Sequence, residues 1–407
     1  MQIRKLTSCN SRRASNLVAT ADITALVAKL MEEIESGGDD KIIELSRRFD
    51  GFEPRWIGLR PFNEYRLERS LRDSISAAAN RIEFFCQFQK EQYQDRYFED
   101  EVGSFGYCYK PVKRIGAYIP GGRYPLISSA LMTLIPATVA GVSQRIACSP
   151  SKHPAILAAA SLAGATRFLH IGGVQAIAAM GLGFCESDPV DMLVGPGNQY
   201  VNAAKQYLQG RLAVDTAAGP SELLILAEDS THGEWLIADM AAQAEHDPQA
   251  ISLLVSDSKA LLDKVLVMIK RDKHLSHLYK TEQINLLQAT DIEQMIKFSD
   301  DFSPEHLLLA DSRINPDLLN HYGAIFIGEN SAVAYGDYCS GPNHTLPTAG
   351  AARYSSGLSV ANFLKIQTQQ KVSDDGRTQL AQIAENLAQA EQLVWHQRSM
   401  QVRSKAS

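Results

Sequence analysis

The sequence lacks long apolar runs. No stretch of about 18 consecutive apolar residues occurs, and the amino terminus, MQIRKLTSCNSRRAS, has no apolar core like that of a signal peptide. Cysteine is also sparse, because six cysteines are scattered along the chain and no two form a CxxC pair. These absences argue against a disulfide framework and a thiolate zinc site, and they fit a reducing compartment. We therefore expect a cytoplasmic protein.

The sequence also lacks a large excess of positive or negative charge. The formal net charge is −6 at pH 7, which gives no general electrostatic reason to bind nucleic acid or an anionic membrane. The basic carboxyl terminus, HQRSMQVRSKAS, is interpreted as a solvated tail. From the charge we therefore expect neither nucleic acid nor membrane as a partner. Because 407 residues are too many for one compact core, we also expect two or three domains.

The first hundred residues have the apolar spacing of helices. The stretches ITALVAKLMEEI and DKIIELSRRFDGF show it, and so does a longer one that ends near residue 93. From about residue 112 the pattern changes to short apolar runs that end in turn residues: RIACSP, RFLHIGG and DMLVGPGN. They alternate with the helical stretches HPAILAAASLAGA and VQAIAAMGLGF. This alternation predicts a parallel sheet with helices on its faces.

A second set of strands follows the segment DTAAGPSE. Its runs are ELLILAE, ISLLVSD, INLLQA, HLLLA and AIFIG, with helices between most of them, and the chain returns to helix from about residue 360. We therefore predict an α/β protein with two Rossmann-like parallel-sheet domains and helical segments at both termini. No GxGxxG fingerprint is present. No internal repeat is obvious in the residues.

Three glycine-rich turns are candidates for ligand binding. They are YIPGGRYP, IGGVQ and VGPGNQ, and each follows a predicted strand or lies in a loop. Each alone is more simply read as a turn. Three of them in one unit favour a nucleotide cleft, because such turns expose backbone N–H groups at the carboxyl ends of strands.

Polar side chains in two other places could hold a metal ion. Gln243 and His246 are three apart on a predicted helix and share a face, although such a pair alone is more often surface or core. The turn-rich loop YGDYCSGPNHTLPT adds Asp337, Tyr338 and His344. Nitrogen and oxygen ligands without cysteine suit a zinc ion with a position open to substrate.

The segment FSPEHL allows two interpretations. Ser303 and the following proline have the pattern of a helix start, in which Glu305 complements the helix dipole and His306 is incidental. Alternatively, Glu305 and His306 are an acid–base pair, a carboxylate that activates water and an imidazole that takes a proton.

Several motifs together resemble the histidinol dehydrogenase family. They are YIPGG, GGVQAIAA, GPGN, AGPSE, QAEHDP, SPEHL, GDYCSGPNHTLPT and AEQLVWH, in the family's order from about residue 111 to the carboxyl terminus. The resemblance implies oxidation of L-histidinol through the aldehyde to L-histidine, the last step of histidine biosynthesis, with two NAD and one water. A paralogue oxidising another small polar alcohol, such as a sulfonated diol, stays open. The sequence departs from the family's usual residues at Cys86, Ala217 and Thr345.

The resemblance also implies roles for particular residues. His306 would be the base and Glu305 would activate the water. One zinc ion per subunit would be held by Gln243, His246, Asp337 and His396, with His396 supplied by the partner subunit of a homodimer with shared active sites. The other positions implied are substrate contacts at Ser128, Ser221, Tyr338, His344 and Glu391, and NAD contacts at Tyr118, Gln175 and Asn198.

The same resemblance suggests how the chain divides. Residues 1–20 would be an extension, and residues 118–220 an NAD-binding domain. We expect residues 21–117 and 221–358 to form a catalytic, metal-binding domain together. The helical tail, residues 359–407, would contribute to the partner subunit's site. The alternative to an enzyme is a homologue that has lost its catalytic activity and only binds a ligand or a partner. That hypothesis predicts loss of a zinc ligand or a catalytic residue. All are present.

Overall fold

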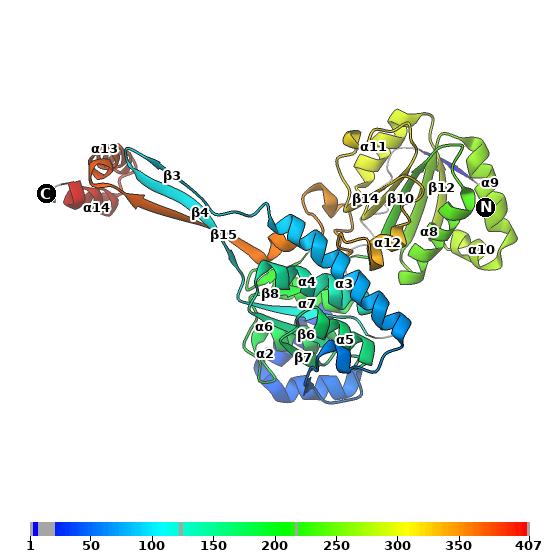
Figure 1. Ribbon diagram of the computed structural model, residues 1–407, viewed down its shortest axis with the longest axis horizontal. Coiled ribbons are helices and arrows are strands. Elements are labelled where there is room, and N and C mark those ends of the chain that lie inside the picture. The colour runs from blue at the N-terminus through cyan, green and yellow to red at the C-terminus, as the bar shows by residue number, and fades with distance from the viewer. Residues whose placement is uncertain (1–2, 7–20, 122–124, 216–218, 405–407) are drawn as a thin grey trace.

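The structure, a computed structural model, describes residues 3–6, 21–121, 125–215 and 219–404. Within these ranges the chain forms two lobes and a projecting arm (Figure 1). Each lobe contains a six-stranded sheet, and the arm carries a three-stranded sheet. The α/β class with two largely parallel sheets is therefore confirmed. No helix in the described ranges is long and apolar enough to cross a membrane.

The first sheet has the strand order β2-β7-β6-β5-β8-β9, and only the edge strand β2 is antiparallel to its neighbour. Its central strands are short apolar runs because helices cover both faces. From β5 the chain adds strands first on one side and then on the other, which creates a switch point between β5 and β8. The strands are β2 (Arg55–Ile57), β5 (Arg114–Tyr118), β6 (Gln144–Ser149), β7 (Arg167–His170), β8 (Met192–Val194) and β9 (Ala213–Val214).

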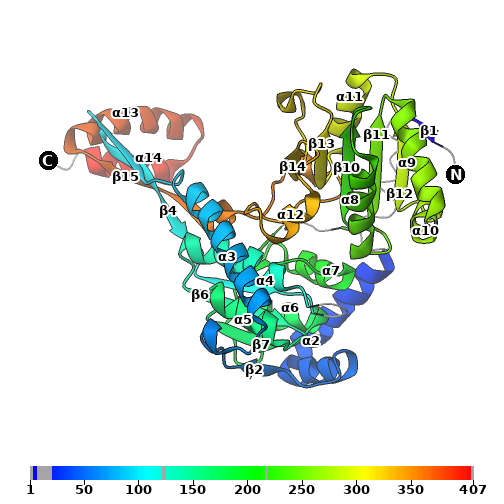
Figure 2. The ribbon, with the colours of Figure 1, turned by 45° about the vertical axis from the view of Figure 1, so that its right-hand side comes forward.

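Helices from two parts of the chain cover this first sheet. One face is covered by α2, α6 and α7, and the other by α3, α4 and α5 (Figure 2). We expected residues 21–117 to group with the second unit, but the apolar stripes of α2 and α3 are buried in the two cores of the first sheet. The helices are α2 (Ala21–Phe49), α3 (Arg69–Lys90), α4 (Ile127–Ala140), α5 (Pro154–Leu162), α6 (Gly173–Leu182) and α7 (Gln199–Leu208).

The second sheet repeats this strand order. Its order is β1-β12-β11-β10-β13-β14, all parallel, so β10 and β13 meet at a switch point as β5 and β8 do. The amino-terminal extension supplies only the edge strand β1 (Arg4–Lys5) here, and residues 1–2 and 7–20 lie outside the described part. The remaining elements are β10 (Glu222–Ala227), α8 (Gly233–His246), β11 (Ile251–Ser256), α9 (Lys259–Arg271), α10 (Lys273–Lys280), β12 (Ile284–Gln288), α11 (Ile292–Phe302), β13 (His306–Ala310), β14 (Ala324–Ile327) and α12 (Val333–Tyr338).

The arm corrects the expected helical tail. Residues 364–372 form the strand β15, which pairs antiparallel with β4 along its whole length, and β4 pairs with β3. The expected return to helix follows this strand as two helices, which pack on each other at the end of the arm. The elements are β3 (Arg96–Asp100), β4 (Gly103–Pro111), β15 (Leu364–Val372), α13 (Asp374–Ala390) and α14 (Val394–Ser404).

Candidate active site

Neighbouring strands of the second sheet bring a glutamate and a histidine together at the sheet's amino edge. Glu305 directly precedes β13, and His306 is its first residue. Glu222, the first residue of β10, contacts both: its backbone N–H donates to Glu305 Oε2 at 2.8 Å, and its carbonyl oxygen lies 3.2 Å from His306 Nδ1. Both side chains are buried, and His306 is only 4% exposed. The pairing of β10 with β13 therefore holds the side chains of Glu305 and His306 against the backbone of Glu222.

The helix-start interpretation of FSPEHL is wrong. Ser303 ends α11 in the left-handed conformation, with φ 48°, and its N–H donates to Ser299 O at 2.7 Å. No helix begins there, because the following apolar run, HLLLA, is the strand that its pattern predicts and is buried in the sheet. A left-handed conformation is uncommon for a residue other than glycine, and it turns the chain sharply just before Glu305.

The carboxylates around His306 determine its protonation. Burial lowers the pKa of its imidazole, but Glu305, whose Oε2 is 3.4 Å from Nδ1, and then Asp337 outweigh that effect and raise the pKa to about 9. Nε2 of the imidazole lies 3.9 Å from Asp337 Oδ1. Because Nδ1 faces the Glu222 carbonyl, a neutral His306 that donates from Nδ1 has Nε2 as its acceptor on the Asp337 side.

The helix α8 ends at the same edge. It returns from the carboxyl end of β10 to the amino end of β11, and Gln283, which precedes β12, donates to the Ala244 and Asp247 carbonyls near its end. Gln243 is 2% exposed, and its Nε2 is buried without a hydrogen-bond partner. Glu245 is exposed, as expected for a residue on another face of this helix. His246 is the last residue of α8.

The loop after β14 completes this group. Asp337 lies on the short helix α12, which packs against α8. His344 Nδ1 lies 2.9 Å from the Asp337 carbonyl oxygen, and its Nε2 is buried without a partner. Burial lowers the pKa of His344, and the Asp337 carboxylate opposes this effect. Tyr338, next to Asp337, is exposed.

The same loop joins the site to the first lobe. Asn343 Nδ2 donates to the Met132 carbonyl of α4 at 2.6 Å. Ser128 lies in the first turn of that helix, and Ser221 directly precedes β10. Because β9 ends at Val214 and β10 begins at Glu222, a short connection leads from the carboxyl edge of the first sheet to the amino edge of the second.

Three more predicted residues lie at the carboxyl edge of the first sheet. Tyr118 ends β5, and its hydroxyl accepts from Gly173 N at 3.3 Å. Gln175, in the first turn of α6, is buried and donates from Nε2 to Asp50 Oδ2 at 2.9 Å. Asn198 caps α7 and is exposed. The three side chains therefore border the ends of β5, β7 and β8, the edge where open α/β sheets bind ligands.

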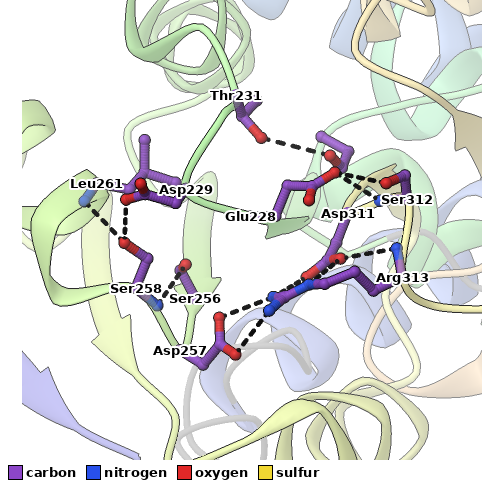
Figure 3. A network of polar contacts seen from close by, with 11 residues as sticks. Glu228, Asp229, Thr231, Ser256, Asp257, Ser258, Leu261, Asp311, Ser312 and Arg313 are labelled. Atoms are coloured by element: carbon purple, nitrogen blue, oxygen red, sulfur yellow. Dashed lines mark hydrogen bonds and ion pairs between the residues drawn. The ribbon is translucent and has the colours of Figure 1, made fainter.

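The carboxyl edge of the second sheet is filled by the chain's own side chains (Figure 3). Arg313 donates to buried Asp311 and, through two nitrogens, to Asp257 at 2.8 and 3.1 Å. Glu228 accepts from the Ser312 backbone and hydroxyl. These groups lie at the switch point between β10 and β13, and their carboxylates would repel a phosphate. The first sheet is therefore the better candidate for a dinucleotide.

His396 and Glu391 lie apart from the other predicted residues. His396 is an exposed residue of α14, and Glu391 caps α13, so both lie at the end of the arm. Figures 1 and 2 both show these helices far from the two sheets. Within the described ranges, no group of three or more His, Cys, Asp and Glu side chains is placed to hold a metal ion.

Sequence reasoning missed four residues at the two edges. Glu222 carries a signal that could have found it, since a charged residue opens the otherwise apolar run ELLILA. Asp50, Lys205 and Asp215 carry none, because their partners are backbone atoms and side chains distant in sequence. Of the departures from the family pattern, Cys86 is buried in α3, Thr345 has a buried Oγ1 without a partner, and Ala217 lies outside the described residues.

Fold and site together define an α/β enzyme with one open doubly wound sheet and a buried Glu–His pair on another. The sequence model of the histidinol dehydrogenase family matches residues 13–404, and the chain belongs to that family. It is thus an NAD-dependent oxidoreductase acting through alcohol and aldehyde steps.

Individual relatives agree along nearly the whole length. Histidinol dehydrogenase of Thermus thermophilus is 38% identical over 394 residues, covering 94% of each chain. That of Methanothermobacter thermautotrophicus is also 38% identical, covering 98% of this chain and 99% of the relative. The crystal structure of histidinol dehydrogenase from Elizabethkingia anophelis has a TM-score of 0.87 at 33% identity and covers 99% of this chain and 94% of its own.

A more distant likeness concerns the fold alone. Glyceraldehyde-3-phosphate dehydrogenase from Methanocaldococcus jannaschii, solved with NADP, has a TM-score of 0.50 at 12% identity. The match covers 88% of this chain and 91% of that one.

Proposed function

We propose that this chain oxidises L-histidinol to L-histidine through the aldehyde, with NAD as hydride acceptor and zinc at the amino edge of the second sheet. The observation that carries the proposal is the buried Glu305–His306 pair, fixed to Glu222 and facing Asp337. The family's shared histidinol dehydrogenase name supports the substrate. A catalytically idle homologue would have no reason to keep a carboxylate and an imidazole buried together.

The residues at this edge fit a zinc ion. The Nε2 of Gln243 is buried without a hydrogen-bond partner, and because the nitrogen and oxygen of an amide exchange places by a flip, Oε1 can take that position and offer a lone pair to a metal ion. Gln243, His246 and Asp337 would hold the metal from one chain, and their nitrogen and oxygen donors suit zinc. Bound there, zinc would anchor the substrate's amine and imidazole nitrogens and offset the negative charge of Asp337.

His306 and Glu305 divide the proton chemistry in this proposal. Above its raised pKa of about 9, His306 is neutral, keeps Nδ1–H on the Glu222 carbonyl and can accept the substrate's hydroxyl proton at Nε2 as a hydride leaves the carbinol carbon. The aldehyde must then be hydrated before a second hydride can depart. Glu305, held by the Glu222 N–H, would take a proton from the attacking water, and the second hydride would require a second NAD as acceptor.

The dinucleotide would lie at the carboxyl edge of the first sheet. Tyr118, Gln175 and Asn198 border it, and the β9–β10 connection leads from it to the catalytic edge. Ser128, Ser221, Tyr338 and His344 lie between the two edges or beside the Glu–His pair, so we assign them to the substrate.

A homodimer with shared sites accounts for the residues on the arm. His396 and Glu391 are too far along the arm to reach their own chain's site in Figures 1 and 2. The arm's end also exposes apolar side chains, among them Leu387, Val394 and Trp395, which favours burial against a second copy. We therefore assign the fourth zinc ligand to His396 of the partner subunit.

The substrate assignment is tested by NADH formation from L-histidinol against a panel of small alcohols that includes a sulfonated diol. Two NADH per histidinol are expected from two hydride transfers. Turnover of another alcohol without turnover of histidinol would overturn the assignment.

Mixing two inactive variants tests the shared site. His306→Asn and His396→Ala are each expected to be inactive as homodimers. After reassociation of equal amounts, half the dimers are mixed and each contains one intact site, so about a quarter of the wild-type activity should return. If His396 served its own chain, neither site of the mixed dimer would be intact and no activity would return.

A further inference from the structure

A lysine and an aspartate form a buried ion pair beside the carboxyl edge of the first sheet. Lys205 lies on α7 and Asp215 directly follows β9, and both side chains are almost fully buried. Their ammonium and carboxylate groups are in direct contact. A buried ion pair seldom stabilises a fold more than apolar side chains of the same size would, so stability alone does not account for this pair.

Both members of the pair hold the same glycine. Lys205 Nζ donates to the Gly195 carbonyl oxygen at 2.9 Å, and Gly195 N donates to Asp215 Oδ2 at 2.6 Å. Gly195 is the first residue after β8, at the start of the GPGN turn. The pair thus satisfies the N–H and the C=O of one peptide residue from opposite sides.

The held glycine lies against the neighbouring strand at the switch point. Its φ is +109°, and a Cβ there would come within 2.1 Å of the Tyr118 carbonyl oxygen at the end of β5. Only glycine permits this conformation together with this close approach. The pair therefore fixes the turn where the two strands diverge.

The turn leads directly to the amino end of α7. Asn198 caps that helix, its side-chain oxygen accepting from Tyr200 N and Val201 N at 3.1 Å, and Asn202 donates to Gly197 O at 2.9 Å. With its oxygen engaged, the exposed Asn198 keeps its NH₂ for a ligand. Because Lys205 lies on the same helix, the turn contacts α7 twice, through the Asn198 cap and through the hydrogen bond from Lys205 to Gly195.

We propose that Lys205 and Asp215 are positioning residues of the dinucleotide site: they hold the Gly195–Asn198 turn so that Asn198 and the amino end of α7 meet the phosphates of NAD. This inference rests on the proposed function, which places NAD at this edge. Backbone N–H groups at a helix amino terminus bind phosphate well only when their direction is fixed in advance.

The double variant Lys205→Met/Asp215→Leu tests the proposal because it removes both charges and leaves neither one unpaired. Such an exchange is often neutral or stabilising, so we expect the variant to fold and to retain zinc. NADH affinity, measured by fluorescence titration, should fall about tenfold, the value for losing one to two hydrogen bonds that preorganise the turn. The KM for NAD should rise similarly, with kcat at saturating NAD changed less than threefold or so.

Two further variants keep the test decisive. Asp215→Asn retains an acceptor for Gly195 N and should weaken NADH binding less than the double variant, and it serves alone if the double variant does not fold. Arg211→Met removes an exposed ion pair with Glu35 near the same helix and should leave NADH binding unchanged. Wild-type NADH affinity in a folded double variant, or in Asp215→Asn if only that variant folds, would overturn the inference. Absence of NADH binding to the wild-type protein would instead overturn the proposed function.

Discussion

Asp239 links the two elements that carry candidate zinc ligands. It lies on α8 one helical turn before Gln243, and its carboxylate accepts a hydrogen bond from the backbone N–H of Val333, the first residue of α12. The helix α12 in turn carries Asp337. Replacing Asp239 by asparagine keeps an acceptor for Val333 and removes the charge, whereas alanine removes both.

The magnitude follows from the burial of this carboxylate. Burial raises the pKa of Asp239 from 3.8 to about 6, and the Val333 hydrogen bond opposes the shift only in part. At about 1.4 kcal/mol per pKa unit, the complete shift would correspond to about 3 kcal/mol. Because the carboxyl group is not completely enclosed, we expect about 1–2 kcal/mol. A raised folded-state pKa means that this cost is present above about pH 6 and disappears as the pH falls towards 4.

Thermal unfolding of the metal-free protein measures the effect. At pH 8, Asp239→Asn should melt roughly 2–6 °C above the wild-type protein, and the difference should shrink as the pH falls to 5. Asp239→Ala should melt below Asp239→Asn at both pH values and should retain less zinc, because α12 loses its contact with α8. A Tm difference that stays constant from pH 5 to 8, or a wild-type protein that is the more stable at pH 8, would refute the reasoning.

Three other predictions concern the two edges of the second sheet. Gln243→Leu removes a buried amide nitrogen without a partner, so the metal-free variant should be as stable as the wild type or more stable by up to about 1 kcal/mol, while zinc content by elemental analysis falls. Arg313→Met leaves Asp311 buried without its cation and should cost about 2–3 kcal/mol in denaturant titration, with kcat unchanged because this network lies at the edge opposite the Glu–His pair. His306→Asn should abolish the first hydride transfer, whereas Glu305→Gln should impair conversion of the aldehyde to the acid more than formation of the aldehyde. Equal loss in both steps would contradict this division, as single-turnover kinetics can show.

Strands and helices with a buried face could be predicted from the sequence. The runs RIACSP, ISLLVSD and HLLLA are strands because covering helices require apolar side chains on both faces. The arm's strands escaped detection because they are largely exposed, and nearly every residue of LKIQTQQKV is accessible to solvent, so its apolar alternation is weak. FSPEHL stayed ambiguous because serine followed by proline fits a helix start and also fits a helix that ends at Ser303 before a strand that starts at His306.

The candidate site was predictable only where its residues are neighbours in sequence. Glu305 and His306 are adjacent in sequence, and Gln243 and His246 are spaced to share a helix face. Both pairs can therefore be recognised from the sequence without a structure. The contacts of Glu222 with the Glu–His pair depend on the register of β10 against β13, which no local pattern encodes. The sequence also did not predict that the two sheets share a strand order, because their amino-acid sequences show no obvious repeat.

The two lobes share a strand order but have their candidate sites on opposite edges. In open parallel sheets, ligands ordinarily bind at the carboxyl ends of the strands, and the first sheet carries its candidate dinucleotide residues at that edge. In the second sheet Arg313 and its carboxylates fill the corresponding edge, and the Glu–His pair lies at the amino ends of the strands. Because seven residues separate the end of β9 from the start of β10, and Asn343 donates to the Met132 carbonyl, the carboxyl edge of the first sheet lies toward the amino edge of the second. Had the second lobe kept its chemistry at the usual edge, the length of its strands would separate that chemistry from the first sheet. In the proposed function, using the amino edge is what would allow a dinucleotide on one lobe to meet the Glu–His pair on the other.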